Sequence, residues 1–403
     1  MAAFAMNLRR AACWVAGVLA STTLVPAMAA GACDRSTWPL WQNYAERYLQ
    51  DDGRMLESSM LPNHSTSEGQ SYGMVFALVA NDRERFDKLW SWTAANMMGS
   101  DLKTRLPGWL WGQGEDGVWK LQDANSASDA DLWIVYALLE AARVWQHPAY
   151  RNDALALLKT LESRLVVDLP GLGKMVLPGP EGFAQPDHLW RLNPSYLPVP
   201  LLRRLAKEAP AGPWAQIANN TRRLIEASSP KGFVADWVGY RGTAPATGLF
   251  VVDPVKGELG SYDAIRVYLW AGMTPASDPL AAPLLARLDG MSASTASSGT
   301  PPEKVQVISG ASEGQAPFGY SAALLPYFQA KGQSWLAEQQ QRKVEQGVSK
   351  ALARDPKDRS EPAYYNLMLS LFAMGWVEKR YQFRDDGTLK LSWETSCPRA
   401  VTR

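Results

Sequence analysis

The sequence predicts an all-α fold in which pairs of helices close into a ring. Apolar residues recur with helical spacing along most of the chain, and only short stretches such as 249–252 have the composition of a strand. Because most of these helices follow one another as hairpins, a closed ring of pairs is favoured over a four-helix bundle. The predicted helices span residues 37–49, 68–81, 83–97, 129–145, 149–166, 196–208, 213–228, 263–273, 277–290, 318–330, 333–352 and 361–376.

The fourth segment shows the helical pattern well, since Leu132, Val135 and Leu139 fall on one face. Ser128 precedes this helix, and Tyr262, itself preceded by Ser261, comes before the eighth, as start signals do. No repeat is strict enough for a solenoid. Binding residues tend to gather on loops carried by a rigid scaffold. The longer connections, which hold much of the Gly, Pro and Trp, are 98–128, 167–195, 229–262 and 291–317, with 292–302 as one surface loop.

The first thirty residues have the layout of a secretory signal peptide. Arg9 and Arg10 precede an apolar run over 11–25, and small residues follow at 26–30. The run is short for a membrane span, and the alternative is a buried N-terminal helix. We therefore expect a periplasmic or secreted protein without a membrane anchor. Residues 31–403 contain no charge tract or long linker, which predicts a single domain.

The chain has three cysteines, and Cys13 would leave with the signal peptide. Cys33 and Cys397 remain, near opposite ends of the mature chain. In an oxidising compartment the two could form one disulfide, and the alternative is two free thiols.

Composition narrows the classes of partner. The 41 Lys and Arg residues nearly balance the 40 Asp and Glu residues, and no basic block occurs, which argues against a nucleic-acid partner. The 17 Trp and 14 Tyr residues are the distinctive feature. Flat aromatic side chains suit partly exposed surfaces on which sugar rings stack, and the alternative is an aromatic-rich core.

The three histidines leave little room for histidine-based catalysis, and no metal, phosphate-loop or dinucleotide motif occurs, so we expect no cofactor. Residues 69–73 fit G-x-S-x-G, yet no strand precedes them, which disfavours a serine hydrolase. Catalysis therefore depends on carboxylates.

Three acidic residues begin predicted helices. Glu68 and Asp129 could simply be first-turn acids that interact with the helix dipole. That dipole would lower the pKa of Glu68, so a role as general acid requires burial or a like-charged neighbour. Asp263 precedes Arg266 by three residues, which suits a general base and also fits a surface ion pair. Two carboxylates about 6.5–9.5 Å apart would invert the anomeric centre of a sugar.

Four segments in order carry a family resemblance. They are Ser67-Glu68-Gly69-Gln70-Ser71-Tyr72-Gly73, Ala127-Ser128-Asp129-Ala130-Asp131, Asn193-Pro194-Ser195-Tyr196 and Tyr262-Asp263-Ala264-Ile265-Arg266. Trp109-Leu110-Trp111-Gly112, Asp236-Trp237 and Ala363-Tyr364-Tyr365-Asn366 add to them. Over essentially the whole mature chain, the sequence resembles glycoside hydrolase family eight, the cellulase D family. Within that family it is most similar to the periplasmic endoglucanases of bacterial cellulose-synthesis operons.

The resemblance implies an (α/α)6 barrel and inverting cleavage of β-1,4-glucan, with the cellulose-synthase complex as a candidate partner. Glu68 matches the proton donor of the family and Asp263 the base. Asp129 matches an acid that holds the central sugar. The resemblance also places further substrate-binding residues in the cleft, namely Trp111, Tyr196, Arg266 and Tyr365.

Two other functions remain open from sequence. A non-catalytic glucan-binding protein would keep the aromatic residues without needing Glu68 and Asp263. A polysaccharide lyase on a similar barrel would need a Tyr/His or Arg site for uronic acids, which the near-neutral charge and few histidines disfavour.

Overall fold

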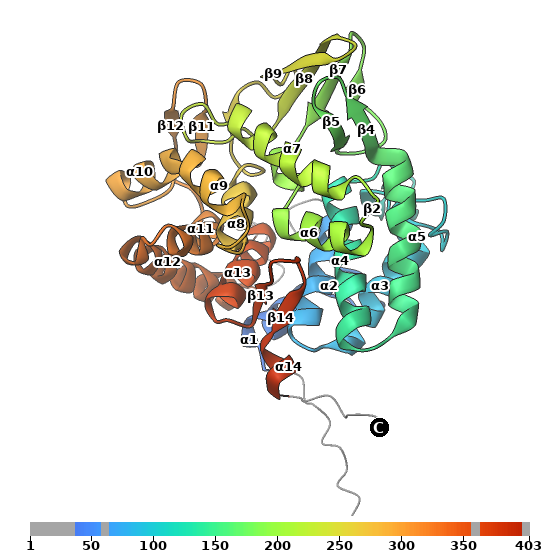
Figure 1. The fold of residues 1–403 in the computed structure, drawn as a ribbon. Coiled ribbons are helices and arrows are strands. Elements are labelled where there is room, and N and C mark those ends of the chain that lie inside the picture. Colours follow the sequence, from blue (N-terminus) through green and yellow to red (C-terminus); the bar gives the residue numbers. More distant parts are fainter. Residues whose placement is uncertain (1–36, 58–63, 356–362, 397–403) are drawn as a thin grey trace, which may run out of the picture. The chain divides into compact units, whose positions relative to one another are not determined.

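Six helices form a closed inner ring in the computed structural model, which describes residues 37–57, 64–355 and 363–396 (Figure 1). Each inner helix packs against the next, and the last packs against the first. In order around the ring they are α2 (Ser67–Val79), α4 (Ser128–Val144), α6 (Val199–Glu208), α8 (Ile265–Met273), α11 (Phe318–Ala330) and α13 (Tyr364–Val377).

An outer helix packs against each inner one. The outer helices are α3 (Arg83–Met97), α5 (Pro148–Leu165), α7 (Trp214–Ala227), α9 (Ala281–Arg287), α12 (Ser334–Ala353) and α1 (Pro39–Tyr48), the last of which contacts α13. The predicted all-α fold and its (α/α)6 arrangement are confirmed.

Burial explains which helices are inner. Nearly every residue of α2, α4, α8 and α11 is buried, whereas α3, α5 and α12 bury one stripe. Aromatic rings from several inner helices meet inside the ring, where Phe372 lies 5.3 Å from both Tyr72 and Trp133 and 5.2 Å from Trp270, measured between ring centres. Part of the excess of aromatic residues therefore lies in the core, which was the alternative to a sugar-binding surface.

Short antiparallel sheets occupy the connections between helices. The predicted strand at 249–252 is confirmed within β9 (Thr247–Val252), the last strand of the sheet β6–β7–β8–β9. The other strands are β1 (Ser65–Thr66), β2 (Leu110–Gln113), β3 (Trp119–Asp123), β4 (Val166–Leu169), β5 (Gly173–Val176), β6 (Ala184–Gln185), β7 (Leu189–Leu192), β8 (Val238–Ala244), β10 (Leu259–Gly260), β11 (Lys304–Gln306), β12 (Ala311–Glu313), β13 (Tyr381–Phe383) and β14 (Leu389–Leu391).

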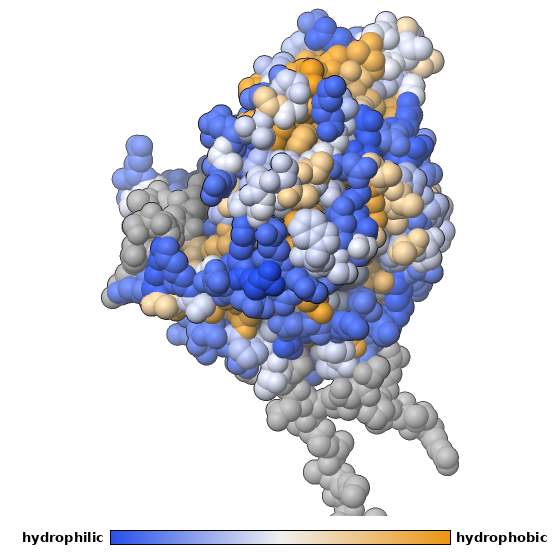
Figure 2. All heavy atoms as spheres, turned by 90° about the vertical axis from the view of Figure 1, so that its left-hand side faces the viewer, coloured by the Kyte–Doolittle hydropathy of each residue, from blue (hydrophilic) through white to orange (hydrophobic). Residues whose placement is uncertain are grey.

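Apolar side chains are exposed along β9 and the turns beside it. Figure 2 shows apolar surface near the top of the view, the level at which Figure 1 places β8 and β9. Leu249, Val252, Val255 and Ile308 are each about half exposed. A cavity of about 160 Å³ opens beside them, lined in part by Trp237. Exposed apolar side chains therefore lie along β9, the edge strand of this sheet, and beside it.

The structure differs from the sequence prediction at two helices. The single helix expected over 277–290 is α9 alone, and the expected surface loop 292–302 contains most of α10 (Asp289–Ser298). This loop prediction was wrong because small polar residues obscured the helix. A contact with the N-cap residue of α12 holds it, since Ser292 Oγ donates to Gln333 Oε1 at 2.6 Å. Gly299 then ends the helix in the left-handed region, with φ of 75°.

A third difference concerns the start of α4. Ala127, and not Ser128, occupies the N-cap, and no side chain caps this helix. The signal-peptide prediction and the pairing of Cys33 with Cys397 lie outside the described residues. Within those residues, no helix combines the length and apolarity that a membrane crossing requires.

Candidate active site

Glu68 lies in the first turn of α2, held there by the strands beside it. β1 pairs with β2, with Ser65 opposite Trp111. Thr66 caps α2, and its side chain accepts a hydrogen bond from the Gly69 amide at 3.2 Å. The indole of Trp109, just before β2, donates to Glu68 Oε1 at 3.1 Å. The capped helix and the indole together fix the direction of the Glu68 carboxyl group.

The surroundings of Glu68 favour its protonated form. Burial, and then the negative charge of Asp129, raise the pKa of Glu68 to about 8. The hydroxyl of Ser67 donates to Glu68 Oε2 at 3.2 Å and opposes that rise only in part. The dipole of α2 is outweighed by burial and a like charge, the two conditions that a general acid at this position requires. At neutral pH Glu68 therefore holds a proton that it can donate.

Asp129 occupies the first turn of α4 beside Glu68 and is almost fully buried. The hydroxyl of Tyr72 donates to Asp129 Oδ2 at 3.4 Å, and Arg266 Nη2 lies 3.8 Å from the same oxygen. Burial raises the pKa of Asp129 to about 6, against the lowering effect of Arg266. Asp131 lies two residues further along α4 and is also buried, and burial raises its pKa as well.

Asp263 lies in the turn before α8 and faces two donors. Trp237 Nε1 donates to Asp263 Oδ2 at 3.0 Å, and Arg266 Nη2 donates to Oδ1 at 2.9 Å. The side chain of Asp263 keeps 30% of its surface exposed, whereas that of Asp129 keeps 2%. Asp263 is thus anchored to a cation and still accessible to solvent or a ligand.

Asp236 holds the turn that carries Asp263. Asp236 Oδ1 accepts hydrogen bonds from the backbone amides of Ser261 at 2.8 Å and Ala264 at 2.7 Å. Asp236 Oδ2 accepts from the Ser261 hydroxyl at 2.6 Å. The next residue, Trp237, binds Asp263 directly. Asp236 and Trp237 therefore position Asp263 from both its backbone and its side chain.

Arg266 joins four predicted site residues. Besides Asp263 and Asp129, Arg266 contacts the Tyr365 hydroxyl at 3.4 Å through Nη1, and its guanidinium carbon lies 5.9 Å from the centre of the Tyr196 ring. The hydroxyl of Ser195 also accepts from Arg266 Nη2 at 3.0 Å. Burial lowers the pKa of Arg266, but the acids and tyrosines around it more than compensate and raise it overall. The cation therefore stays charged at the centre of the site.

Trp111 lies in a second aromatic cluster. Its ring meets Trp92 edge-on with 5.1 Å between ring centres and stacks on Trp119 with 5.2 Å between them. The carboxylates are surrounded by Tyr196, Arg266 and Tyr365. Trp111, in contrast, lies on β2 and packs against Trp92 on α3 and Trp119 on β3.

Sequence reasoning missed several residues that contact the carboxylates or hold them in place, among them Trp109, Tyr72, Asp236 and Trp237. All four fall inside the segments that carry the family resemblance, so the motif itself was the available signal. No spacing rule would identify them, since Trp237 reaches Asp263 from 26 residues away and Trp109 reaches Glu68 from 41.

The site combines a carboxyl group that is protonated near neutral pH with a second carboxylate held by a guanidinium and an indole. A pair of carboxyl groups in unlike environments is what acid-base cleavage of a glycosidic bond requires. Two aromatic side chains, Tyr196 and Tyr365, lie beside these carboxyl groups through their contacts with Arg266.

Comparisons with known proteins identify the family of this chain. The family model described as Glycosyl hydrolases family 8 matches residues 6–379. An endoglucanase of Pseudomonas fluorescens (strain SBW25) is 54% identical over 398 residues, which are 97% of this chain and 99% of that protein. An endoglucanase of Escherichia coli (strain K12) is 40% identical, covering 94% and 97% of the two chains. The crystal structure of an endo-1,4-D-glucanase from Vibrio fischeri ES114 superposes with a TM-score of 0.81 at 36% identity, over 89% of this chain and 99% of that one.

Proposed function

This chain belongs to glycosyl hydrolases family 8, and from that premise we propose that it is an inverting endo-β-1,4-glucanase with Glu68 as general acid and Asp263 as general base. The family and the endoglucanase relatives establish a glycoside hydrolase of the endoglucanase type. The assignment of roles rests on one observation, that the environment of Glu68 raises its pKa to about 8 while Asp263 is paired with Arg266.

In the proposed reaction a glucan chain lies across the site with Asp129 hydrogen-bonded to the central sugar. Glu68 donates its proton to the glycosidic oxygen as the bond from the anomeric carbon to that oxygen breaks. A water molecule attacks the anomeric carbon from the opposite face, and Asp263 accepts its proton. The new hydroxyl is then α, and proton exchange with solvent restores both carboxyl groups.

The donors around Asp263 suit this role. Arg266 and Trp237 each bind one oxygen, so the carboxylate cannot rotate, and its exposed part remains available to water. Arg266 also approaches Asp129 through the same nitrogen, so one guanidinium holds Asp263 and Asp129 at a fixed separation. Such preorganisation is what general-base catalysis needs.

The experiment is proton NMR of cellohexaose hydrolysis by the wild type and by Glu68→Gln and Asp263→Asn. We expect α-anomer product first from the wild type. Each variant should be folded and slower by about 10²–10⁴-fold, the usual contribution of a general acid or base. Glu338→Gln, at an exposed position on α12, is the matched control and should behave as wild type.

Early β-anomer would overturn the inverting mechanism. No cleavage of cellohexaose or polymer by the wild type, with binding intact, would support the glucan-binding protein. An unsaturated, ultraviolet-absorbing product would identify a lyase.

We also propose that residues 1–30 direct export to the periplasm and that the enzyme acts on glucan made by a cellulose-synthase complex. The support is the layout of these residues, with Arg9 and Arg10 before an apolar run. Cell fractionation should find the full chain outside the cytoplasm and a chain lacking 1–30 inside it. Deletion of the gene should change the amount or length of cellulose that a producing cell exports, and unchanged cellulose would contradict the biosynthetic role.

A further inference from the structure

The β2–β3 hairpin carries an aromatic surface that the proposed chemistry does not use. Trp111 on β2 stacks on Trp119 on β3 with 5.2 Å between ring centres and 22° between planes. The guanidinium carbon of Arg54 lies 5.1 Å from the centre of the Trp111 ring and 4.8 Å from that of Trp119. We call Arg54, Trp111 and Trp119 together the hairpin platform.

The distances show which face of Trp119 is covered. A guanidinium on the face of Trp119 opposite Trp111 would be separated from Trp111 by two contact layers, about 7 Å in all. Arg54 is only 5.1 Å from Trp111, so Arg54 and Trp111 lie on the same side of Trp119. The other face of Trp119 is directed away from both groups.

Exposure agrees with that geometry. Trp119 keeps 42% of its surface exposed, and its neighbour Val118 keeps 53%. The ring is nevertheless held firmly, because Trp111 stacks beneath it and Trp92 in turn packs edge-on against Trp111 at 5.1 Å. A large aromatic ring that is fixed from one side and partly exposed binds flat apolar faces at little entropic cost.

The tryptophans of the platform lie on the hairpin that begins just after Trp109, with Trp119 at its end away from Glu68. Trp109, which donates to Glu68, immediately precedes β2, and Trp119 pairs with Gln113 at the far end of that strand. Four residues of extended chain span roughly 13 Å, about two to three glucose units. A sugar on Trp119 would therefore not be the one that reacts.

We propose that the outer face of Trp119 is a stacking site for a glucose ring of a long β-1,4-glucan chain, remote from the sugars at the carboxylates. This inference rests on the proposed function and names an additional contact for the same substrate. The C–H faces of glucose supply the flat apolar surface that such a ring binds, and neutral glucan is not repelled by Arg54.

The test compares long and short substrates with Trp119→Ala and Trp119→Phe. For Trp119→Ala we expect a KM on soluble β-1,4-glucan polymer about 5- to 10-fold higher, the effect of losing one aromatic contact. Both kcat and KM on cellotetraose should stay within about twofold, because cleavage at its middle bond leaves two sugars on either side of the acid, too few to place one on a platform two to three units beyond the reacting sugar. Trp119→Phe retains a flat ring and should recover most of the affinity for polymer.

Trp335→Ala is the matched control, because Trp335 on α12 is also exposed, at 59%, and lies on an outer helix. It should leave both substrates unaffected. Affinity electrophoresis through a gel containing the polymer, with Glu68→Gln present in every variant, measures binding without turnover.

If Trp119→Ala migrates and turns over polymer as Trp335→Ala does, the platform is not a glucan site. An equal loss on cellotetraose would also overturn the inference, since it would place Trp119 in the reacting part of the cleft or show that the hairpin has come apart. Failure of the proposed function looks different, because the wild type itself would then cleave neither substrate.

Discussion

At the scale of single residues, burial decides what each carboxyl group can do. Glu68 and Asp129 both begin helices, where a dipole stabilises negative charge. Burial overrides that stabilisation, since it is the largest cause of the raised pKa in both groups, about 8 for Glu68 and about 6 for Asp129. Asp263 has a similar position in sequence but retains partial exposure and a paired guanidinium. Three similar acids therefore receive different environments.

The raised pKa of Glu68 predicts a pH-dependent cost to stability. The folded state holds the Glu68 proton up to about pH 8, whereas the unfolded chain releases it near 4.5. The stability linked to this proton is therefore complete below pH 4.5 and lost as pH rises through about 8. Glu68→Gln cannot ionise, so it should exceed the wild type in unfolding free energy by about 1–3 kcal/mol at pH 9 and by much less at pH 5.

Denaturant unfolding at both pH values measures that difference, and a gap of the same size at pH 5 and 9 would contradict it. The same pKa sets the alkaline limit of activity, because the acid must be protonated. Wild-type kcat/KM should fall above about pH 8.

A second prediction concerns the hydrogen bonds by which Asp236 positions the turn that carries Asp263. In Asp236→Asn the remaining oxygen still accepts from the Ser261 and Ala264 amides, as Oδ1 does now, and the new amide can donate to the Ser261 hydroxyl. In Asp236→Ala all three bonds are lost and the turn bearing Asp263 is released. We expect kcat to fall about 10²-fold in the alanine variant, as a misplacement of about 1 Å can cause, and only a few-fold in the asparagine variant.

Steady-state kinetics with cellohexaose measures kcat of the two variants, and their melting temperatures show whether the fold is retained. Equal losses of kcat in both variants would show that the charge of Asp236 matters and its hydrogen bonds do not.

The sequence predicted the residues around Arg266 better than the indole groups that donate to the carboxylates. Asp129, Asp263, Arg266 and Tyr365 come together as expected, because each is recognisable within a local motif. The indole donors were not predicted as site residues. Whether a tryptophan donates to a carboxylate, stacks in the core or covers a hairpin depends on the loops, and the 17 tryptophans look alike in sequence.

At the scale of elements, periodicity identified the inner and outer helices because each buries a face or its whole surface. It did not identify most of the sheets, because their strands are short and some of them pair over long separations. Leu189 pairs with Arg241 across β7 and β8, for example, a pairing that no local pattern encodes. Helix α10 was missed for the opposite reason, since its residues are small and polar and tertiary contacts hold it.

Close helix packing gives an element-scale prediction at Gly272. An added Cβ there would lie 2.2 Å from the Tyr327 backbone nitrogen, so α8 could not approach α11 as it does. Gly272→Ala should destabilise the fold by about 3 kcal/mol or more, because backbone must move. It should also reduce activity, because α8 carries Arg266. Thermal unfolding and kcat on cellohexaose measure the two effects.

Gly375→Ala is the comparison within another inner helix. Its Cβ would meet side-chain atoms of Tyr381 at 3.0 Å and Trp38 at 3.1 Å, which can shift slightly. We expect a smaller loss, about 1 kcal/mol. Similar losses in the two variants would refute the argument from backbone contact.

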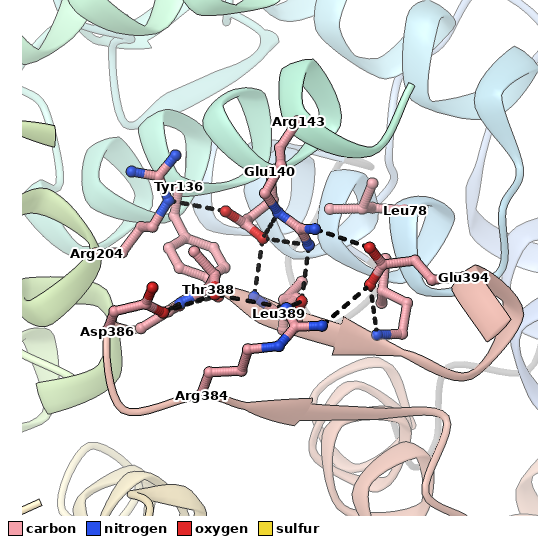
Figure 3. A network of polar contacts seen from close by, with 12 residues as sticks. Leu78, Tyr136, Glu140, Arg143, Arg204, Arg384, Asp386, Thr388, Leu389 and Glu394 are labelled. Atoms are coloured by element: carbon pink, nitrogen blue, oxygen red, sulfur yellow. Dashed lines mark hydrogen bonds and ion pairs between the residues drawn. The ribbon is translucent and has the colours of Figure 1, made fainter. Parts of the chain in front are cut away.

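At the scale of the whole molecule, a buried carboxylate joins the barrel to its last hairpin (Figure 3). Glu140 on α4 has a fully buried side chain. Its Oε1 accepts from Arg204 on α6, and its Oε2 accepts from Arg143 and from the Leu389 amide of β14, each at 2.8 Å. Arg143 also reaches Glu394 at 2.8 Å. One carboxylate thus links two inner helices to a hairpin about 250 residues further along the chain.

Glu140→Gln should therefore destabilise the whole fold without touching the chemistry. The amide would leave the buried guanidinium of Arg204 with Glu208 as its remaining carboxylate partner. Breaking a buried ion pair from one side costs up to about 3–5 kcal/mol, and the pair with Glu208 should keep the loss near the lower end. Lys207→Met removes an ion pair with Asp386 that is about half exposed, which should cost under about 1 kcal/mol. Urea unfolding compares the two variants, and kcat at 15 °C should stay within about twofold of wild type in both. If Glu140→Gln unfolds at the same urea concentration as Lys207→Met, the hairpin is not held through Glu140.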